Sequence, residues 1–204
     1  MTRLVLASAS PARRKLLLNA GISPVVVVSS VDEPALAAAL STLSPNDLAL
    51  ELARAKARDV AAQFTPEDDV VIVGCDSILE MDGVAHGKPS SPDDAKARWA
   101  AMAGRQGTLR TGHWVVRSTT GHEVGEVAST QVFHARPSEQ EIDAYIATGE
   151  PLQVAGGFTI DGLGGPFVER IDGDWSNVVG LSLPLLRLLL RDVGVVWTDL
   201  WREP

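Results

Sequence analysis

The chain has 204 residues, of which 45% are hydrophobic, and its formal net charge is −8. This composition predicts a sizeable buried core and excludes a disordered chain. The acidic balance excludes a broad nucleic-acid surface, because phosphate-backbone binding needs clustered Lys and Arg. A small phosphorylated ligand is still allowed, since it needs only a local basic pocket.

The cysteine content and the apolar segments predict a soluble, cytoplasmic protein with no membrane partner. Cys75 is the single cysteine, so no internal disulfide can form, as is typical of a reducing compartment. With no base beside it, Cys75 is interpreted as a small buried hydrophobe. Residues 1–7 resemble a short strand rather than a secretion signal. The apolar run 181–190 is interrupted by Pro184 and Arg187 and is too short to span a bilayer.

Strand and helix signals alternate along the chain, which predicts an α/β or α+β fold. Helix starts are marked by Ser followed by Pro or by a capping box, and helix ends by Gly. In chain order we predict a strand at 4–7, a helix from 11 to 21, a buried strand at 24–28, a helix from 45 to about 63, a buried strand at 70–73, a helix from 92 to 104, a hairpin over 108–130, a helix from 139 to 149, glycine-rich strand segments within 156–172 and a last helix from 184 to before 194. No repeat or linker is visible, so a single domain over 1–204 is expected.

Hydroxyl and guanidinium groups gather where the first predicted strand meets the first helix. Ser8, Ser10, Arg13 and Arg14 lie in this segment. Free backbone N–H groups and the helix dipole make such a place attractive to phosphate, and the side chains add further donors. The alternative is an ordinary capped helix whose basic residues lie on its exposed face.

Two carboxylates follow predicted strands. Asp76 comes just after the strand at 70–73, and Glu33 follows the strand at 24–28. A carboxylate at the carboxyl end of a buried strand commonly faces the ligand crevice of an α/β sheet. Asp76 is a candidate for holding Mg²⁺ or taking a proton from water, and Glu33 for a second oxygen ligand. The alternatives are a turn-capping role for Asp76 and a solvated loop position for Glu33.

Two lysines are further candidates for phosphate contacts. Lys56 falls in the middle of the apolar arc of its predicted helix. A cation there needs a partner or a ligand because an unpaired buried charge is costly; the alternative is snorkelling at the edge of the core. Lys88 lies in a loop between a glycine and a proline, where a solvated lysine is the alternative.

Taken together, these segments resemble the Maf family, whose members are also called septum-formation inhibitor-like proteins. The resemblance covers nearly the whole chain. It is carried by Leu6-Ala7-Ser8-Ala9-Ser10-Pro11-Ala12-Arg13-Arg14, Val31-Asp32-Glu33, the Lys56 helix, Gly74-Cys75-Asp76-Ser77, Gly87-Lys88-Pro89, Thr111-Gly112, Ala155-Gly156-Gly157-Phe158 and Asn177-Val178-Val179-Gly180-Leu181.

The resemblance implies a mixed twisted sheet with flanking helices and two lobes around a central nucleotide cleft, often in a homodimer. It also implies a divalent metal, Mg²⁺ or Mn²⁺, and pyrophosphohydrolase chemistry on a normal or modified nucleoside triphosphate. Asp76 matches the family's proposed proton acceptor. The other polar cleft residues of the family are matched by Ser8, Arg13, Glu33, Lys56 and Lys88.

The positions that differ between substrate branches of the family fit neither branch here. The branch that acts on dTTP and UTP has Arg, Thr and Gln where this chain has Ala12, Ser77 and Asp161. The branch that acts on 7-methyl-GTP has Trp, Gln and Glu there. Gly107 and Val154, which replace His and Lys of the pyrimidine branch, bring the chain nearer to the methylguanosine branch.

Asp161 is therefore predicted to read the base. An ionised carboxylate only accepts hydrogen bonds, and the guanine edge offers two adjacent donors where uracil and thymine offer one. The alternative is that Asp161-Gly162 is a turn pair outside the pocket.

The expected reaction is attack of water on the α-phosphorus, which releases pyrophosphate. Glu33 and Asp76 are assigned to the metal, with Asp76 also orienting or deprotonating water. Arg13, Lys56 and Lys88 are assigned to the triphosphate, and Ser8 and the helix start after Ser10 to phosphate oxygens. The rival hypotheses are a non-catalytic nucleotide-binding regulator of cell division and a phosphatase that releases orthophosphate.

Overall fold

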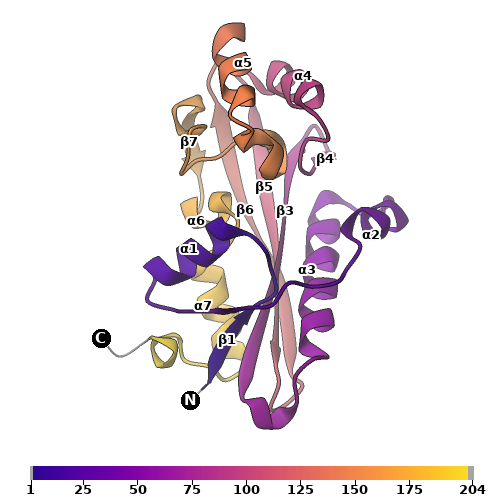
Figure 1. Cartoon of the computed structure of the whole chain (residues 1–204), viewed down its shortest axis with the longest axis vertical. Helices are drawn as coiled ribbons and strands as arrows, with labels where there is room; N and C mark the ends of the chain where they lie inside the picture. The colour runs from indigo at the N-terminus through magenta and orange to yellow at the C-terminus, as the bar shows by residue number, and fades with distance from the viewer. Residues whose placement is uncertain (1, 202–204) are drawn as a thin grey trace. The chain divides into compact units, whose positions relative to one another are not determined.

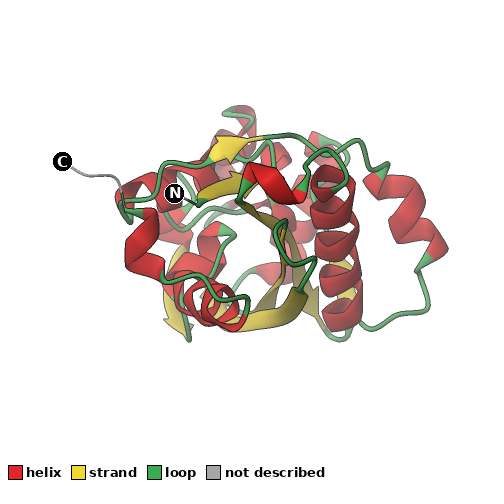
Figure 2. Cartoon of the chain, turned by 90° about the horizontal axis from the view of Figure 1, so that it is seen from below, coloured by secondary structure: helices red, strands yellow, loops and turns green. Residues whose placement is uncertain are grey.

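The computed structural model describes residues 2–201, and it contains a mixed set of helices and strands (Figures 1 and 2). The strands are β1 (Arg3–Leu6), β2 (Val25–Val26), β3 (Val70–Met81), β4 (Val84–His86), β5 (Gln106–Arg117), β6 (Glu123–His134) and β7 (Val168–Asp172). The α-helices are α1 (Pro11–Asn19), α2 (Glu33–Ala39), α3 (Pro45–Ala61), α4 (Pro92–Met102), α5 (Glu139–Ala147), α6 (Trp175–Val179) and α7 (Leu183–Asp192). Short 3₁₀ helices are η1 (Pro66–Asp68), η2 (Glu150–Gln153), η3 (Ala155–Gly157), η4 (Gly165–Phe167) and η5 (Trp197–Leu200).

The strands form one mixed sheet of seven strands in the order β2-β1-β3-β5-β6-β7, with β4 paired to β3. β1 pairs in parallel with both β2 and β3, whereas β3–β4 and β6–β7 are antiparallel. The predicted fold class, a mixed sheet with helices, is confirmed.

Two compact units divide the chain, and each is discontinuous in sequence. The first unit contains residues 1–76, 111–128 and 180–204, and the second contains residues 77–110 and 129–179. β3, β5 and β6 each contribute residues to both units.

Helix starts follow the local sequence rules closely. Ser10, Ser44, Ser91 and Ser182 each accept a hydrogen bond from a first-turn backbone N–H, and a proline stands in the same first turn. Ser138 and Glu141 form the predicted capping box of α5. These interactions involve neighbouring residues only, which is why the sequence predicts them well.

Close approach of α3 to the sheet organises the first unit. A Cβ at Gly74 in β3 would lie 2.8 Å from the backbone nitrogen of Ala57, and a Cβ at Gly112 in β5 would lie 2.7 Å from the backbone nitrogen of Leu50. Only glycine leaves room for the helix backbone at these two points. The buried face of α3 is therefore held against the strands, and Lys56 lies on that face.

An aromatic cluster forms the core of the second unit. Trp99 of α4 is 1% exposed and makes edge-to-face contacts with His134, Tyr145 and Phe167. Its indole Nε1 donates a hydrogen bond of 2.9 Å to the Gly157 carbonyl, which ties the glycine-rich segment to α4.

Several predicted elements need correction. Only Val25 and Val26 of the segment 24–28 form a strand, and each is 41% exposed because β2 is a sheet edge. β3 does not end at Val73 but continues to Met81. Most of the segment 156–167 is 3₁₀ helix and loop, with a strand only at β7. The short helices α2 and α6 were not predicted.

We predict that Gly74→Ala destabilises the protein. Its methyl group would meet the backbone of α3, which the strand cannot move away from without losing its ladder, so overpacking should cost about 1–3 kcal/mol of unfolding free energy. Urea denaturation measures this loss.

Gly87→Ala is the matched control, because a Cβ there meets nothing within 4 Å. Equal stability of the Gly74→Ala variant and the control would contradict the proposed close packing of α3.

Candidate functional site

A buried lysine joins two carboxylates in the first unit. Lys56 is 5% exposed, and its Nζ lies 2.6 Å from Asp76 Oδ1 and 2.8 Å from Glu33 Oε2. Lys56 therefore has two partners of opposite charge. The snorkelling alternative is wrong, because the ammonium group itself is buried between carboxylates.

The parallel register explains why these residues meet. β1 ends at Leu6, which pairs with Val26 of β2 and with Val73 of β3. Carboxyl ends of parallel strands share one edge of a sheet, so the segments after β1 and β2 emerge beside the part of β3 that follows Val73. That part carries Asp76. Asp76 was predicted to follow the strand; it lies within β3 instead, but beyond the level at which the parallel strands β1 and β2 end.

Glu33 reaches the same place from a helix start rather than from a loop. It is the first residue of α2, whose N-cap is Asp32, and the side chain of Asp32 accepts from Ala35 N at 3.0 Å. α2 packs against α3. The Glu33 side chain is 50% exposed, whereas that of Asp76 is 12% exposed, so the two carboxylates differ strongly in their access to water.

Burial controls the protonation behaviour of this cluster. Burial raises the pKa of the Asp76 carboxyl above its usual value, and the charges of Lys56 and Arg13 only partly oppose the shift. Burial likewise raises the pKa of the neighbouring Cys75 thiol to about 11. Cys75 is thus a neutral buried thiol near pH 7, as its interpretation as a hydrophobe requires.

The predicted phosphate segment is tied down by Arg13. Its Nε donates to the Gly180 carbonyl at 2.6 Å and one guanidinium nitrogen donates to Ser8 Oγ at 3.0 Å. Ser8 Oγ also accepts from Ser10 N at 3.2 Å. Arg13 is only 9% exposed and acts electrostatically on Asp76. The alternative of a basic residue on an exposed helix face is wrong for Arg13, although it holds for Arg14, which is exposed.

The Gly180 carbonyl accepts a hydrogen bond from Arg13, and the sequence did not predict this acceptor. A backbone carbonyl carries no side-chain signature, and the hydrogen bond joins residues at opposite ends of the chain.

The remaining predicted residues lie in the second unit. Ser77 is half-buried in β3, Lys88 is exposed after β4, and Asp161 is exposed in the loop before η4. Their assignments to substrate stay predictions.

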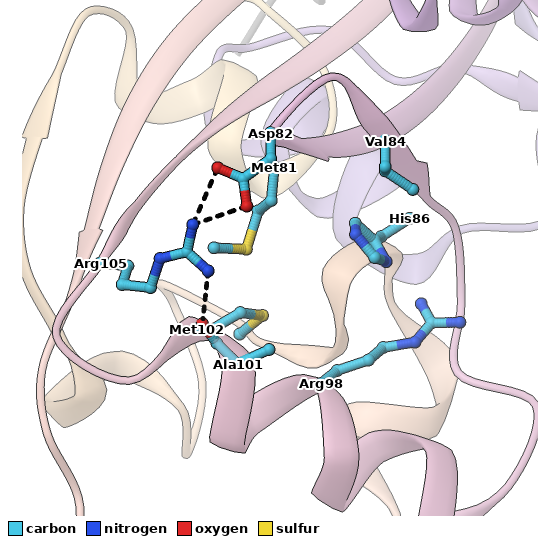
Figure 3. Close-up of a pocket in the computed structure, with 8 residues that line it drawn as sticks. All are labelled: Met81, Asp82, Val84, His86, Arg98, Ala101, Met102 and Arg105. Atoms are coloured by element: carbon cyan, nitrogen blue, oxygen red, sulfur yellow. Dashed lines mark hydrogen bonds and ion pairs between the residues drawn. The ribbon is translucent and has the colours of Figure 1, made fainter.

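A cavity of about 150 Å³ in the second unit does not involve the predicted residues. It is lined by Met81, Asp82, Val84, His86, Arg98, Ala101, Met102 and Arg105 (Figure 3). Its two arginines already have carboxylate partners, since Arg105 binds Asp82 and Arg98 binds Asp94. We assign it no role.

Glu33 and Asp76 are the residues of this cluster that could bind a divalent metal. Among residues 2–201, no group of three or more His, Cys, Asp or Glu side chains is arranged to hold a metal ion. Glu33 and Asp76 both contact the ammonium of Lys56, so their oxygens lie close enough together to bind one cation. Mg²⁺ and Mn²⁺ commonly take one or two protein carboxylates and complete their coordination with water and substrate phosphates. The pair therefore fits a metal that binds together with a phosphorylated ligand.

Known proteins similar to this chain point to one family. Residues 3–193 match the family described as Maf-like protein. The chain belongs to this family. A relative from Nocardia farcinica is 58% identical over 98% of this chain and 97% of its own length. Relatives from Rhodococcus opacus (55% identical, 98% and 97% covered) and Streptomyces coelicolor (54% identical, 98% and 94% covered) are similar. Each of the three is named nucleoside triphosphate pyrophosphatase.

One solved structure, a nucleoside-triphosphatase or dITP/XTP pyrophosphatase from Mycobacterium abscessus, is also similar to this Maf-family chain. It is 19% identical, and the match covers 67% of this chain and 76% of that one with a TM-score of 0.36. That likeness is too weak to support a conclusion about function.

In the described part of the chain, no helix is both long and apolar enough to cross a membrane.

We predict that Lys56→Met destabilises this Maf-family protein in a pH-dependent way. Removing the ammonium leaves the buried Asp76 carboxylate without its main counter-charge, which should cost about 3 kcal/mol of unfolding free energy near neutral pH. The folded-state pKa of Asp76 would rise further above its unfolded value of about 3.9. The folded state then binds the extra proton, so the variant regains stability relative to wild type as the pH falls from about 7.5 to about 5.

Urea denaturation at both pH values measures the effect, with the exposed Lys15→Met as control. Adding Asp76→Asn to Lys56→Met should restore part of the lost stability at neutral pH. A pH-independent deficit that the second substitution leaves unchanged would contradict the pairing.

Proposed function

We propose that the chain is a nucleoside triphosphate pyrophosphohydrolase that converts its substrate to the monophosphate and pyrophosphate. Membership of the Maf family and relatives at 50–58% identity that carry this activity in their names support the proposal. The observation that carries it is the buried Lys56 held between Glu33 and Asp76, with Arg13 close enough to act electrostatically on Asp76. Such a cluster offers both cations for phosphate and a carboxylate for water.

Asp76 is the residue proposed to orient and deprotonate the attacking water. A general base works best with a pKa nearer the working pH, and burial moves the pKa of Asp76 in that direction. Arg13 and Lys56 are proposed to bind the triphosphate, together with Lys88. Ser8 and the start of α1 after Ser10 are proposed to donate hydrogen bonds to phosphate oxygens.

The reaction is written as one in-line displacement. A water oxygen forms a bond to the α-phosphorus while the bond from that phosphorus to the bridging oxygen breaks, and Asp76 accepts the water proton. Pyrophosphate leaves with its negative charge stabilised by the cationic side chains. Glu33 and Asp76 would hold Mg²⁺ or Mn²⁺, which supplies charge neutralisation and lowers the pKa of bound water.

Ala12, Ser77 and Asp161 are proposed to govern which base is accepted. Ala12 offers no aromatic surface for stacking. Asp161 is proposed to accept hydrogen bonds from the base edge and to favour guanine-type bases.

The rival functions differ from the proposed one in what is released from the nucleotide. A non-catalytic regulator of cell division would bind nucleotide without turnover, and a phosphatase would release orthophosphate. The cluster of Lys56 with two carboxylates favours catalysis, because a pure anion site gains nothing from two carboxylates.

A homodimer, a cytoplasmic location and the absence of nucleic-acid partners stay predictions. Sedimentation of the purified protein tests whether it is a homodimer.

We predict that the protein requires a divalent cation and releases pyrophosphate. A panel of nucleoside triphosphates with chromatographic identification of products, with and without chelator, measures this. Full turnover in excess chelator would disprove the metal requirement, and orthophosphate as sole product would disprove the reaction class.

In the same assay Asp76→Asn should lower kcat by about a hundredfold or more, the scale of general-base contributions. The control is Asp93→Asn, which neutralises an exposed carboxylate in the first turn of α4. A folded Asp76→Asn protein with the kcat of the control would remove Asp76 from the catalytic role.

We further predict that Asp161 favours guanine-type bases over pyrimidines by about 1–3 kcal/mol, the range of a good bidentate base contact. Values of kcat/KM for GTP, 7-methyl-GTP, UTP and dTTP in wild type and Asp161→Gln measure this preference. The same base ranking in both proteins would show that Asp161 does not read the base.

A further inference from the structure

One carboxylate in the second unit accepts hydrogen bonds from α5 and from three residues of the segment 159–164. Glu150, the first residue of η2, accepts at Oε1 from Tyr145 Oη at 2.9 Å, from Thr159 Oγ1 at 2.5 Å and from Gly164 N at 3.1 Å. Its other oxygen, Oε2, accepts from Leu163 N at 3.2 Å. Burial alone would raise the pKa of Glu150, but these donors outweigh it and lower the pKa, so the group is an acceptor at neutral pH.

The donors are also joined to one another. Thr159 N donates to Tyr145 Oη at 3.2 Å, and Gly164 N donates to Thr159 Oγ1 as well, at 3.1 Å. The network therefore closes on itself around the carboxylate, and both ends of the segment 159–164 are fixed by it. Networks of this kind are rigid when every member is satisfied.

The loop backbone packs directly on these polar groups. A Cβ at Gly162 would lie 2.7 Å from Glu150 Oε2, and a Cβ at Gly164 would lie 2.8 Å from Thr159 N. No larger residue fits at either position without displacing the network. The segment has no regular secondary structure of its own, so these contacts are what define its path.

Asp161 lies inside this clamped segment, two residues after Thr159 and two before Leu163. We propose that Glu150 is the positioning residue that sets the place of Asp161 and thereby the selectivity for the base. This inference rests on the proposed function, in which Asp161 reads the base.

Glutamine tests the clamp because it keeps the shape of the side chain and loses the charge. Each carboxylate oxygen of Glu150 accepts from a backbone N–H, Gly164 N at Oε1 and Leu163 N at Oε2. The NH₂ group of glutamine would replace one of these oxygens, so the N–H group that donates to it loses that acceptor. The matched control is Glu169→Gln in β7, which removes the same charge from an exposed side chain of the same unit. If Glu150→Gln does not fold, Thr159→Val removes one hydroxyl from the network and is read in the same way.

The first readout is amide hydrogen exchange in the absence of nucleotide. In Glu150→Gln, the amide of Leu163 or of Gly164, whichever faces the NH₂ group, should exchange about tenfold faster or more, as expected for the loss of a hydrogen bond to a charged acceptor. Amides of α3 and of the control should be unchanged. Unchanged exchange at Leu163 and Gly164 would overturn the clamp.

The second readout is the ratio of kcat/KM for GTP to that for UTP, in the wild-type and Asp161→Ala backgrounds. Glu150→Gln should lower the ratio about fivefold or more in the wild-type background and leave it unchanged when Asp161 is already absent. An equal change in both backgrounds, or none in the wild-type background, would overturn the positioning role.

The two hypotheses fail differently. If the wild-type protein hydrolyses no nucleoside triphosphate, the proposed function fails and the recognition role fails with it, before any variant is compared. If wild type and the Glu169→Gln control hydrolyse nucleotides and only the response of Glu150→Gln is missing, the inference about Glu150 fails and the proposed function stands.

Discussion

The first unit depends on a charge that has been taken out of water. The ammonium of Lys56 is tolerated at 5% exposure because Asp76 and Glu33 lie within 2.8 Å of it. Those distances require α3 to lie against the sheet, and Gly74 and Gly112 allow that approach. The glycines, the helix and the ion pairs are thus one arrangement: a side chain at either glycine would move the lysine away from its partners.

If the cluster binds the triphosphate as proposed, the same arrangement would make the basicity of Asp76 depend on that ligand. Lys56 and Arg13 both stabilise the ionised form of Asp76, and burial opposes them. A triphosphate that draws on these two cations would weaken their hold on Asp76 and leave its carboxylate more basic. Under the proposed function, substrate binding and the increased basicity of Asp76 would both follow from one redistribution of positive charge.

The sequence predicts local features and residue types better than long-range pairing. Helix starts such as Ser10 depend on neighbours a few residues away, and the burial of Lys56 follows from helical periodicity. The continuation of β3 through Asp76 was missed because glycine and polar residues break the apolar run, and only pairing with other strands maintains the strand there. The Gly180 carbonyl and the Glu150 network were missed for a related reason: their partners become neighbours only in the folded chain.

The hydrogen bond between Arg13 and Gly180 spans 167 positions of the chain. During synthesis from the N-terminus, Ser8, Arg13, Glu33, Lys56 and Asp76 all leave the ribosome long before the residue that accepts from Arg13. The Arg13 guanidinium can make this hydrogen bond only after the C-terminal segment has been synthesised. The same segment also contributes α7 to the first unit. A nascent chain that stalls or is truncated before residue 180 would hold every side chain of the cluster and still lack its complete geometry.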